Sequence, residues 1–176
     1  HLEMSRTPRI VRPLLVVALA LAISMAFSAS ALAATVTKSG TMLTYNAVSG
    51  ETNNVTVSDN GTTLSSASTG ANISTFSGGT CTKVNNQLLT CPLTSISRVW
   101  VNAGNQNDTA SSTSTVNFTV YGGDGNDTAS ALGNSIGMNN VLRGDAGNDT
   151  LRGGPSFETI LGGEGTDYID GGLGRD

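Results

Sequence analysis

Short apolar runs separated by turn-forming residues follow one another along the chain after residue 40. Runs rich in Val, Thr, Ile and Tyr alternate with clusters of Gly, Asn and Ser, and they lie at Thr41–Asn46, Val55–Ser58, Ile73–Phe76, Leu88–Cys91 and Val99–Asn102. Runs of this length and composition predict strands separated by tight turns. After Ala33 no helical period is present, so the pattern predicts an all-β protein.

After residue 102 the pattern changes to single apolar residues between segments rich in Gly and Asp. The nine-residue phrase Gly-Gly-x-Gly-x-Asp-x-(apolar)-x begins at Gly122, Gly144 and Gly162, and a fourth copy runs from Gly171 to Asp176. This repeat is a signature of parallel β-helices. We therefore expect three-residue strands whose middle side chains point into a roll, at Leu142, Leu151, Ile160 and Ile169.

The spacing of the repeats predicts how their loops stack. Nine-residue windows run without a gap from residue 144, and intact copies alternate with degraded ones such as 153–161. A coil of two strands and two loops contains two repeats, so the chain returns to the same side at every second copy. The spacings are 18 from Asp149 to Asp167, 22 from Asp127 to Asp149 with a four-residue insertion at 131–134, and 19 from Asp108 to Asp127. The intact loops should therefore stack on one edge of the roll.

The composition divides the chain into three parts, of which the first is a leader that ends at residue 33. Residues 34–102 form a short β segment with few aromatic side chains, and residues 103–176 form the roll. Its repeats are weak over 103–121 and strong over 122–176, where the last copy is truncated. A segment as small as 34–102 buries little core, so we expect an irregular β domain or a cap of the solenoid that is supported by its neighbour or by a disulfide.

Residues 1–33 are typical of a Sec-type signal peptide. Three arginines precede the apolar run Leu14–Phe27, and Ala31-Leu32-Ala33 offers a cleavage site, so the mature protein would begin at Ala34. His1-Leu2-Glu3 precede Met4, the expected initiator. A membrane anchor is the alternative, but this apolar run is shorter than the roughly 20 residues that a spanning helix needs. We expect a secreted, extracellular protein with no membrane span after cleavage.

Cys81 and Cys91 lie on either side of two short strands joined by an Asn-rich turn. In an exported chain such a pair is expected to form a disulfide. A zinc or redox pair is the alternative, and the absence of Cys-x-x-Cys spacing disfavours it.

The charge distribution favours a cation as ligand. After residue 33 the chain has 12 acidic and 6 basic residues, and the entire excess of negative charge falls on residues 122–176. Nucleic acid is therefore not expected as a partner, because binding a phosphate backbone requires a basic surface.

The repeat has the chemistry of a calcium site. Calcium takes six to eight oxygen ligands in a flexible geometry, and loops supply them as backbone carbonyls and carboxylates. Glycine lets successive carbonyls turn toward one point, and the Asp at position six adds charge. An ion held between two stacked loops would receive one such Asp from each loop.

We name each glycine-rich loop by the number of its first glycine: 104, 122, 144 and 162. We predict calcium sites between the 122 and 144 loops and between the 144 and 162 loops. A third, weaker site is predicted between the 104 and 122 loops. The far edge is not expected to hold a site, because the loop that would face Gly171–Asp176 carries Pro155, Ser156 and Glu158. The predicted metal-site residues are Gly122, Gly123, Asp124, Gly125, Asp127, Gly144, Asp145, Gly147, Asp149, Gly162, Gly163, Gly165 and Asp167, with Asp108 and Asp176 as weaker candidates.

These residues make the chain resemble the repeats-in-toxin (hemolysin-type) calcium-binding family, whose repeats fold as a parallel β-roll when calcium is present. The resemblance covers 122–176 well and 103–121 weakly, and residues 34–102 are similar to the leading region of small exported bacterial calcium-binding proteins. Family toxins, lipases and proteases generally use an uncleaved C-terminal export signal, whereas this chain carries an N-terminal one.

The leading hypothesis is a secreted, non-enzymatic calcium-binding protein whose roll folds where calcium is plentiful. One alternative is the N-terminal fragment of an exported hydrolase or protease with a calcium-stabilised roll. Against it, no His follows His1, which removes the commonest general base and His-based zinc chemistry. A second alternative is a calcium-gated surface or adhesion module. Neither a protein partner nor self-association is indicated.

Overall fold

The structure is a computed structural model that describes residues 33–70, 72–133 and 137–176. The predicted signal peptide, apart from Ala33, lies outside these residues, as does Asn134 of the predicted insertion. Within the described ranges no helix has the length and apolarity needed to cross a membrane.

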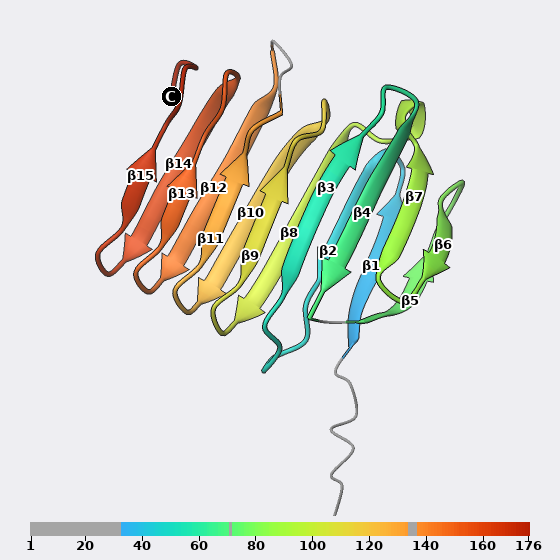
Figure 1. The fold of residues 1–176 in the computed structure, drawn as a ribbon, viewed down its shortest axis with the longest axis horizontal. Coiled ribbons are helices and arrows are strands. Elements are labelled where there is room, and N and C mark those ends of the chain that lie inside the picture. Colours follow the sequence, from blue (N-terminus) through green and yellow to red (C-terminus); the bar gives the residue numbers. More distant parts are fainter. Residues whose placement is uncertain (1–32, 71, 134–136) are drawn as a thin grey trace, which may run out of the picture.

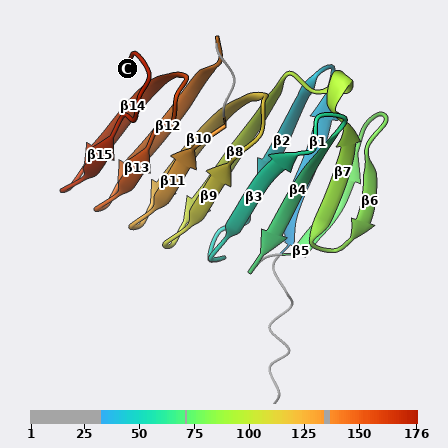
Figure 2. The same ribbon diagram turned by 45° about the horizontal axis from the view of Figure 1, so that its top comes forward.

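Two long sheets face each other and form a flattened roll, as Figures 1 and 2 show. The first sheet (sheet A) has the strand order β14 (Phe157–Glu164), β12 (Asn139–Ala146), β10 (Asn117–Asp124), β8 (Arg98–Asn105), β2 (Met42–Asn46), β1 (Ala33–Ser39), β5 (Asn72–Ser77). The second (sheet B) has the order β15 (Tyr168–Asp170), β13 (Thr150–Arg152), β11 (Thr128–Ala131), β9 (Thr109–Ser112), β3 (Asn54–Asp59), β4 (Thr63–Thr69), β7 (Leu88–Pro92), β6 (Thr82–Asn85). Leu93–Ser95 form a short 3-10 helix. The all-β prediction is confirmed.

The C-terminal strands stack in parallel, one coil on the next, as the repeat predicted. Val120 lies opposite Val101 on one side and Leu142 on the other, and Leu142 lies opposite Ile160 in the next coil. The strands of sheet B pair in parallel with the same steps along the chain. The spacing that we inferred from the aspartates therefore holds for the backbone of both sheets, and the β-roll prediction is confirmed.

The parallel stack also extends to a coil that has no motif. β2 pairs in parallel with β8, and β3 pairs in parallel with β9, so residues 42–59 form one more coil of the roll. The step from this coil to the next is much longer than two repeats, because residues 60–97 leave the roll and return. A division of the chain at residue 102 stays a prediction, since β8 runs across it and both sheets are continuous there.

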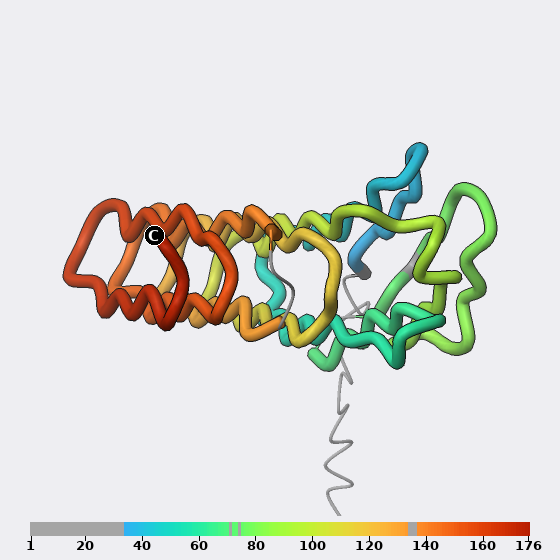
Figure 3. The backbone as a smooth tube through the Cα atoms, turned by 90° about the horizontal axis from the view of Figure 1, so that it is seen from above, coloured from blue at the N-terminus to red at the C-terminus, as the bar shows by residue number. Residues whose placement is uncertain are grey.

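Residues 60–97 and β1 cover one end of the roll with strands that pair antiparallel, except that β5 pairs with β1 in parallel. β4 pairs with β3 and β7, β6 pairs with β7, and β1 pairs with β2, so that this end (green and blue in Figure 3) closes the stack. The apolar runs predict β2, β3, β5 and β7 to within one position at each end, and the two strands around the cysteines are also present. The sequence pattern does not predict β1 or β4, and five of the seven residues of β4 are polar.

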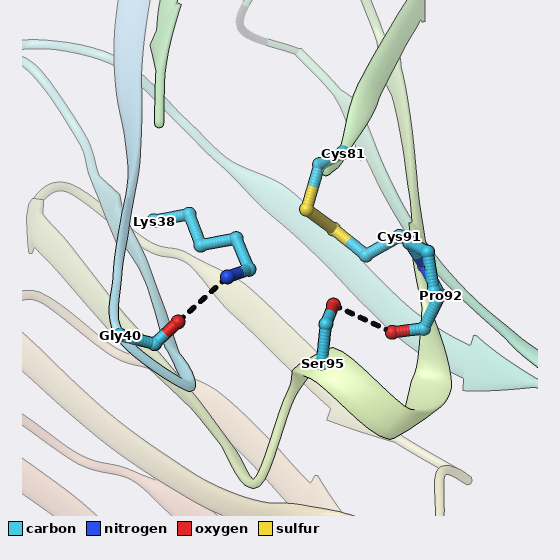
Figure 4. The surroundings of a disulfide bond; sticks show 6 residues. All are labelled: Lys38, Gly40, Cys81, Cys91, Pro92 and Ser95. Atoms are coloured by element: carbon cyan, nitrogen blue, oxygen red, sulfur yellow. Dashed lines mark hydrogen bonds between the residues drawn. A yellow bond between two sulfur atoms is a disulfide. The ribbon is translucent and has the colours of Figure 1, made fainter. Parts of the chain in front are cut away.

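The predicted disulfide is present in this end of the molecule (Figure 4). Cys81 and Cys91 are bonded, with their Cα atoms 4.1 Å apart, and the bond joins the start of β6 to β7. A bridge that closes such a short loop stabilises a fold by about 2–3 kcal/mol, mainly by restricting the unfolded chain.

The core lies between the sheets and becomes thinner toward the C-terminal coils. Its large, fully buried side chains at the capped end are Tyr45, Leu43, Leu64, Ile73 and Leu89. In the coils that follow, the buried apolar side chains of β9 and β11 are alanines, and the coil of β12 and β13 buries Leu142 and Leu151. Ile169 was expected in the core but is 50% exposed, because β15 is at the edge of its sheet.

Candidate metal sites

The aspartates at position six of the repeats form a ladder along one edge of the roll. The Oδ1 atom of Asp127 accepts a hydrogen bond from the backbone N–H of Asp108 at 2.8 Å, and Oδ1 of Asp149 accepts one from Asp127 at 2.7 Å. Oδ1 of Asp167 accepts one from Asp149 at 2.9 Å. Each carboxylate therefore bridges to the preceding coil, as the stacking of intact loops required.

The second oxygen of these carboxylates has no partner within the protein. Asp108, Asp127 and Asp149 are only 3%, 3% and 1% exposed, and Oδ2 of each is buried without a hydrogen bond. A buried carboxylate oxygen without a compensating partner is costly, and coordination of a cation is one of the ways in which proteins satisfy it.

The first glycine of each repeat opens a space beside this free oxygen. A Cβ atom on Gly122 would overlap Oδ2 of Asp127 and lie 2.6 Å from the carbonyl oxygen of Gly144. A Cβ atom on Gly144 would overlap Oδ2 of Asp149 and lie 2.6 Å from the carbonyl oxygen of Gly162. Each space thus collects a carboxylate oxygen of one loop and a carbonyl oxygen of the next, which fits the all-oxygen ligation of calcium.

The electrostatics of the ladder favour a bound cation. Desolvation raises the pKa of Asp127 to about 6, against the hydrogen bond from Asp108, and the charges of Asp108, Asp149 and Asp145 raise the pKa further. Desolvation likewise raises the pKa of Asp149, with contributions from the charges of Asp167 and Asp145. Stacked carboxylates thus destabilise one another, and a divalent cation between them would remove that cost.

The ladder supplies one carboxylate per loop. Among the residues that the structure describes, no three His, Cys, Asp or Glu side chains gather into a metal-binding cluster. Most ligands at these positions would therefore have to be backbone carbonyls, which is the role expected for the glycine-rich loops.

Asp124 and Asp145, two further predicted site residues, lie outside the ladder. They line a depression of about 510 Å³ together with Arg143, Ala146, Gly163 and Glu164. Arg143 donates a hydrogen bond to Oδ1 of Asp145 at 2.6 Å and forms an ion pair with it. Asp145 replaces the second glycine of its repeat and has a φ of 74°, a left-handed conformation that Asp tolerates. Direct ligation by either side chain stays a prediction.

The weaker site predicted between the 104 and 122 loops lacks one feature of the others. Ala103 holds the position of Gly122 in its coil, since Tyr121 lies opposite Asn102 and Gly123 opposite Gly104. An alanine at this position has a methyl group where Gly122 and Gly144 have only hydrogen. In addition, Oδ1 of Asp108 is bonded to the backbone N–H of Asn53 at 2.6 Å, so this carboxylate faces the preceding, motif-free coil.

The far edge of the roll has part of the same pattern. Glu158 is 4% exposed with Oε2 unpartnered, and its backbone N–H donates to Oδ1 of Asp176 at 3.1 Å. Its Oε1 accepts a hydrogen bond from the side chain of Asn140 at 2.9 Å. The sequence disfavours a site here because Glu is not the motif residue, and the expectation that calcium lines one edge only stays a prediction.

A second ladder, formed by the asparagines at position five, was missed in the sequence. The side-chain oxygen of Asn107 accepts a hydrogen bond from the backbone of Asn126, that of Asn126 from Asn148, and that of Asn148 from Thr166, each at 2.8 Å. These bonds run from later to earlier coils, opposite to those of the aspartates, so each pair of loops is held from both sides. The recurrence of Asn directly before Asp was the available signal.

Comparison with known proteins supports this interpretation of the edge. The family model for the RTX calcium-binding nonapeptide repeat, in four copies, matches residues 119–133, 137–156 and 143–176. No curated protein matches the chain, and no solved structure matches it.

Proposed function

The C-terminal third of this chain carries RTX calcium-binding nonapeptide repeats, and we therefore propose that it is a secreted, non-enzymatic calcium-binding protein whose repeat region folds when calcium binds. The observation that carries the proposal is the pair of oxygen-lined spaces at Gly122 and Gly144, each next to a buried, unpartnered carboxylate oxygen.

Folding on binding is supported by the thin core of the roll. The coil of β12 and β13 buries Leu142 and Leu151 as its fully enclosed apolar side chains, and the carboxylates stacked beside them repel each other. Without the ion, so little apolar surface does not offset the conformational entropy of the chain. The free energy of calcium binding then becomes free energy of folding.

The proposed sites are the two between the 122, 144 and 162 loops. Their ligands would be Asp127, Asp149 and Asp167 together with backbone carbonyls of the glycine-rich loops. The position at Asp108 differs from these two, because its carboxylate faces the motif-free coil.

Secretion and the absence of enzymatic activity are supported by the sequence. The Arg-rich start, apolar run and Ala-x-Ala of residues 6–33 are typical of an export signal, and calcium is abundant outside cells. No His follows His1, so a catalytic His would be missing from the chain.

Far-ultraviolet circular dichroism of residues 34–176 tests the proposal. We expect millimolar calcium to increase the β signal and a chelator to reverse the change, while magnesium at the same concentration has little effect because it requires a stricter octahedral geometry. Identical spectra with and without calcium would refute folding on binding.

A further inference from the structure

Two buried, unpartnered carboxylate oxygens lie outside the matched repeats, where the motif-free coil meets the first coil with a motif residue. Glu51, in the loop between β2 and β3, is 6% exposed, and Asp108, after β8, is 3% exposed. Oε1 of Glu51 and Oδ2 of Asp108 are both buried without a hydrogen bond. Neither residue lies within the range matched by the RTX repeat model.

The two loops are held together by a set of hydrogen bonds centred on Asn53. Its backbone N–H and side-chain amide both donate to Oδ1 of Asp108, at 2.6 and 3.2 Å. The same amide donates to the carbonyl oxygens of Glu51 at 3.2 Å and Ala103 at 3.1 Å. Gly50 adds a backbone hydrogen bond to the side chain of Asn105 at 2.6 Å. The loops therefore stack as the repeat loops do.

Asn53 has the position in this coil that aspartate has in the others, because it donates to Asp108 as Asp108 donates to Asp127. Its amide is neutral and its oxygen is already bonded to the hydroxyl of Tyr45 at 2.9 Å. The second negative charge is instead supplied by Glu51, two residues earlier. This pair of loops therefore keeps two carboxylates, the number that balances one divalent cation.

The charges of both carboxylates act on Tyr45, whose hydroxyl donates to Asn53 at the centre of this set of hydrogen bonds. Desolvation raises the pKa of Tyr45 to about 12; a hydrogen bond with Ser68 opposes this, and the charges of Glu51 and Asp108 add to it. Desolvation also raises the pKa of Asp108 to about 6, against the hydrogen bonds from Asn53, and the charge of Glu51 raises it further. The other oxygen of Glu51 faces the backbone N–H of Val48 at 3.4 Å, which leaves Oε1 as its free ligand atom.

From this arrangement we infer that Glu51 and Asp108 hold a further divalent cation, of the calcium type, between the motif-free coil and the first coil of the roll. Hard oxygen donors and a loop-built geometry select calcium over transition metals. The ion would join the N-terminal cap to the repeats, since Glu51 belongs to the coil that β1 and β4 cover. The inference extends the proposed function to Glu51, a residue that the repeat motif does not contain.

Counting bound calcium per chain by equilibrium dialysis of residues 34–176 tests this inference. We expect Glu51→Gln, which keeps the size of the side chain, to lower the count by one ion at saturating calcium, with the calcium-bound circular dichroism spectrum retained. Asp170→Asn is the control, because it removes the same charge from an exposed position outside the ladder and should leave the count unchanged. An unchanged count in Glu51→Gln would overturn the inference.

The result is separable from that of the proposed function. Asp149→Asn removes a carboxylate of the repeat sites only, so it should lower the count while the ion at Glu51 stays. If the unaltered chain binds calcium and Glu51→Gln binds the same number of ions, the repeats bind calcium and this inference alone fails. If the unaltered chain binds no calcium at all, both fail.

A second measurement does not depend on any variant. Anomalous diffraction from crystals of the unaltered chain grown in calcium should give a peak about 2.3–2.6 Å from carboxylate oxygens of both Glu51 and Asp108. Density for the two side chains with no anomalous peak between them would show that the pair is satisfied by a proton instead, and the inference would be wrong.

Discussion

Asp149 is the residue on which the proposed calcium sites depend most, because one of its carboxylate oxygens contacts the preceding loop and the other lines the space at Gly144. Its Oδ1 accepts from the backbone of Asp127, its backbone donates to Asp167, and its Oδ2 faces the space at Gly144. The side chain thus belongs to both pairs of loops, 122 with 144 and 144 with 162. Each proposed site depends on one buried carboxylate oxygen that has no hydrogen bond within the protein and that a cation would satisfy.

We predict that Asp149→Ala weakens calcium binding by about tenfold or more, in keeping with the strong dependence of calcium affinity on ligand charge. The variant should also lose most of the calcium-induced β signal in circular dichroism. Asp170→Ala is the control, since Asp170 is exposed and outside the ladder. Calcium uptake and compactness equal to those of the unaltered chain would remove the basis for the proposed sites.

A substitution at Gly144 tests the oxygen-lined space without changing the charge of the site. The φ of Gly144 is not in the left-handed region, so an alanine there is opposed by contact with the carboxyl group of Asp149 and the carbonyl oxygen of Gly162 and not by backbone strain. We expect Gly144→Ala to cost about 1–3 kcal/mol of stability through overpacking, and to reduce the number of calcium ions bound in a titration.

Gly61→Ala provides the comparison for this variant. Gly61 has a φ of 84° and nothing within 4 Å of an added Cβ, so alanine there is strained but meets no ligand oxygen. It should lower stability by about 1 kcal/mol and leave the number of bound ions unchanged. A Gly144 variant that binds calcium normally would show that the space is not a ligand pocket.

Among the secondary-structure elements, hydrogen bonds between loops hold the coils in register where the short strands contribute little. β13 and β15 have three residues each, and the Asp and Asn ladders fix the turns between such strands from both sides. On the opposite edge Asp59, at the end of β3, has a comparable role for the loop between β9 and β10. Its Oδ2 accepts from the hydroxyls of Ser114 and Thr115 and from the backbone N–H of Thr115.

Asp59 leads to a prediction about pH. Partial burial opposes ionisation, but hydrogen bonds from Thr115, Ser114 and Gly61 outweigh it and lower the pKa of Asp59 to about 2. The unfolded pKa is about 3.9, so the charged carboxylate stabilises the fold above about pH 4, and this contribution is lost as the pH falls from about 4 to 2.

We therefore expect Asp59→Asn to lower stability by about 1.5–3 kcal/mol at pH 7, the range for hydrogen bonds to a charged group. The difference in denaturant midpoint from the unaltered chain should shrink as the pH approaches 2. Asp170→Asn, at an exposed position, should show no such convergence. A gap of constant size from pH 7 to pH 2 would mean that the charge of Asp59 does not contribute.

Across the molecule as a whole, the two ends differ in how they are stabilised. The capped end has the disulfide, antiparallel pairing and most of the large buried side chains, whereas the roll has one or two buried apolar residues in most of its strands and a row of buried acids. β14 and β15 lie at the sheet edges, and Leu161, Tyr168 and Ile169 are half exposed on them. Calcium binding would therefore stabilise the repeat end of the roll far more than the capped end.

Hydrogen exchange measures this difference directly. Without calcium we expect the amides of β1–β4 and β7 to exchange slowly and those of β10–β15 to exchange fast, because local stability follows buried apolar contact. Calcium should slow exchange in the second group. Equal protection of both groups in the presence of a chelator would contradict the idea that the ion supplies the folding free energy of the roll.

The amino-acid sequence was enough to predict the repeat, the coil of two repeats with its insertions, the disulfide and the edge on which Asp127, Asp149 and Asp167 stack. These features follow from local periodicity and composition, since a repeated phrase must repeat its backbone. Other features depend on contacts between distant parts of the chain and became visible only in the folded molecule. Residues 42–59 form a coil of the same roll, the polar strand β4 covers that coil, and the charge of Glu51 acts on Asp108. No motif marks these residues, because their neighbours are brought to them by the long excursion of residues 60–97 and not by the period of the repeat.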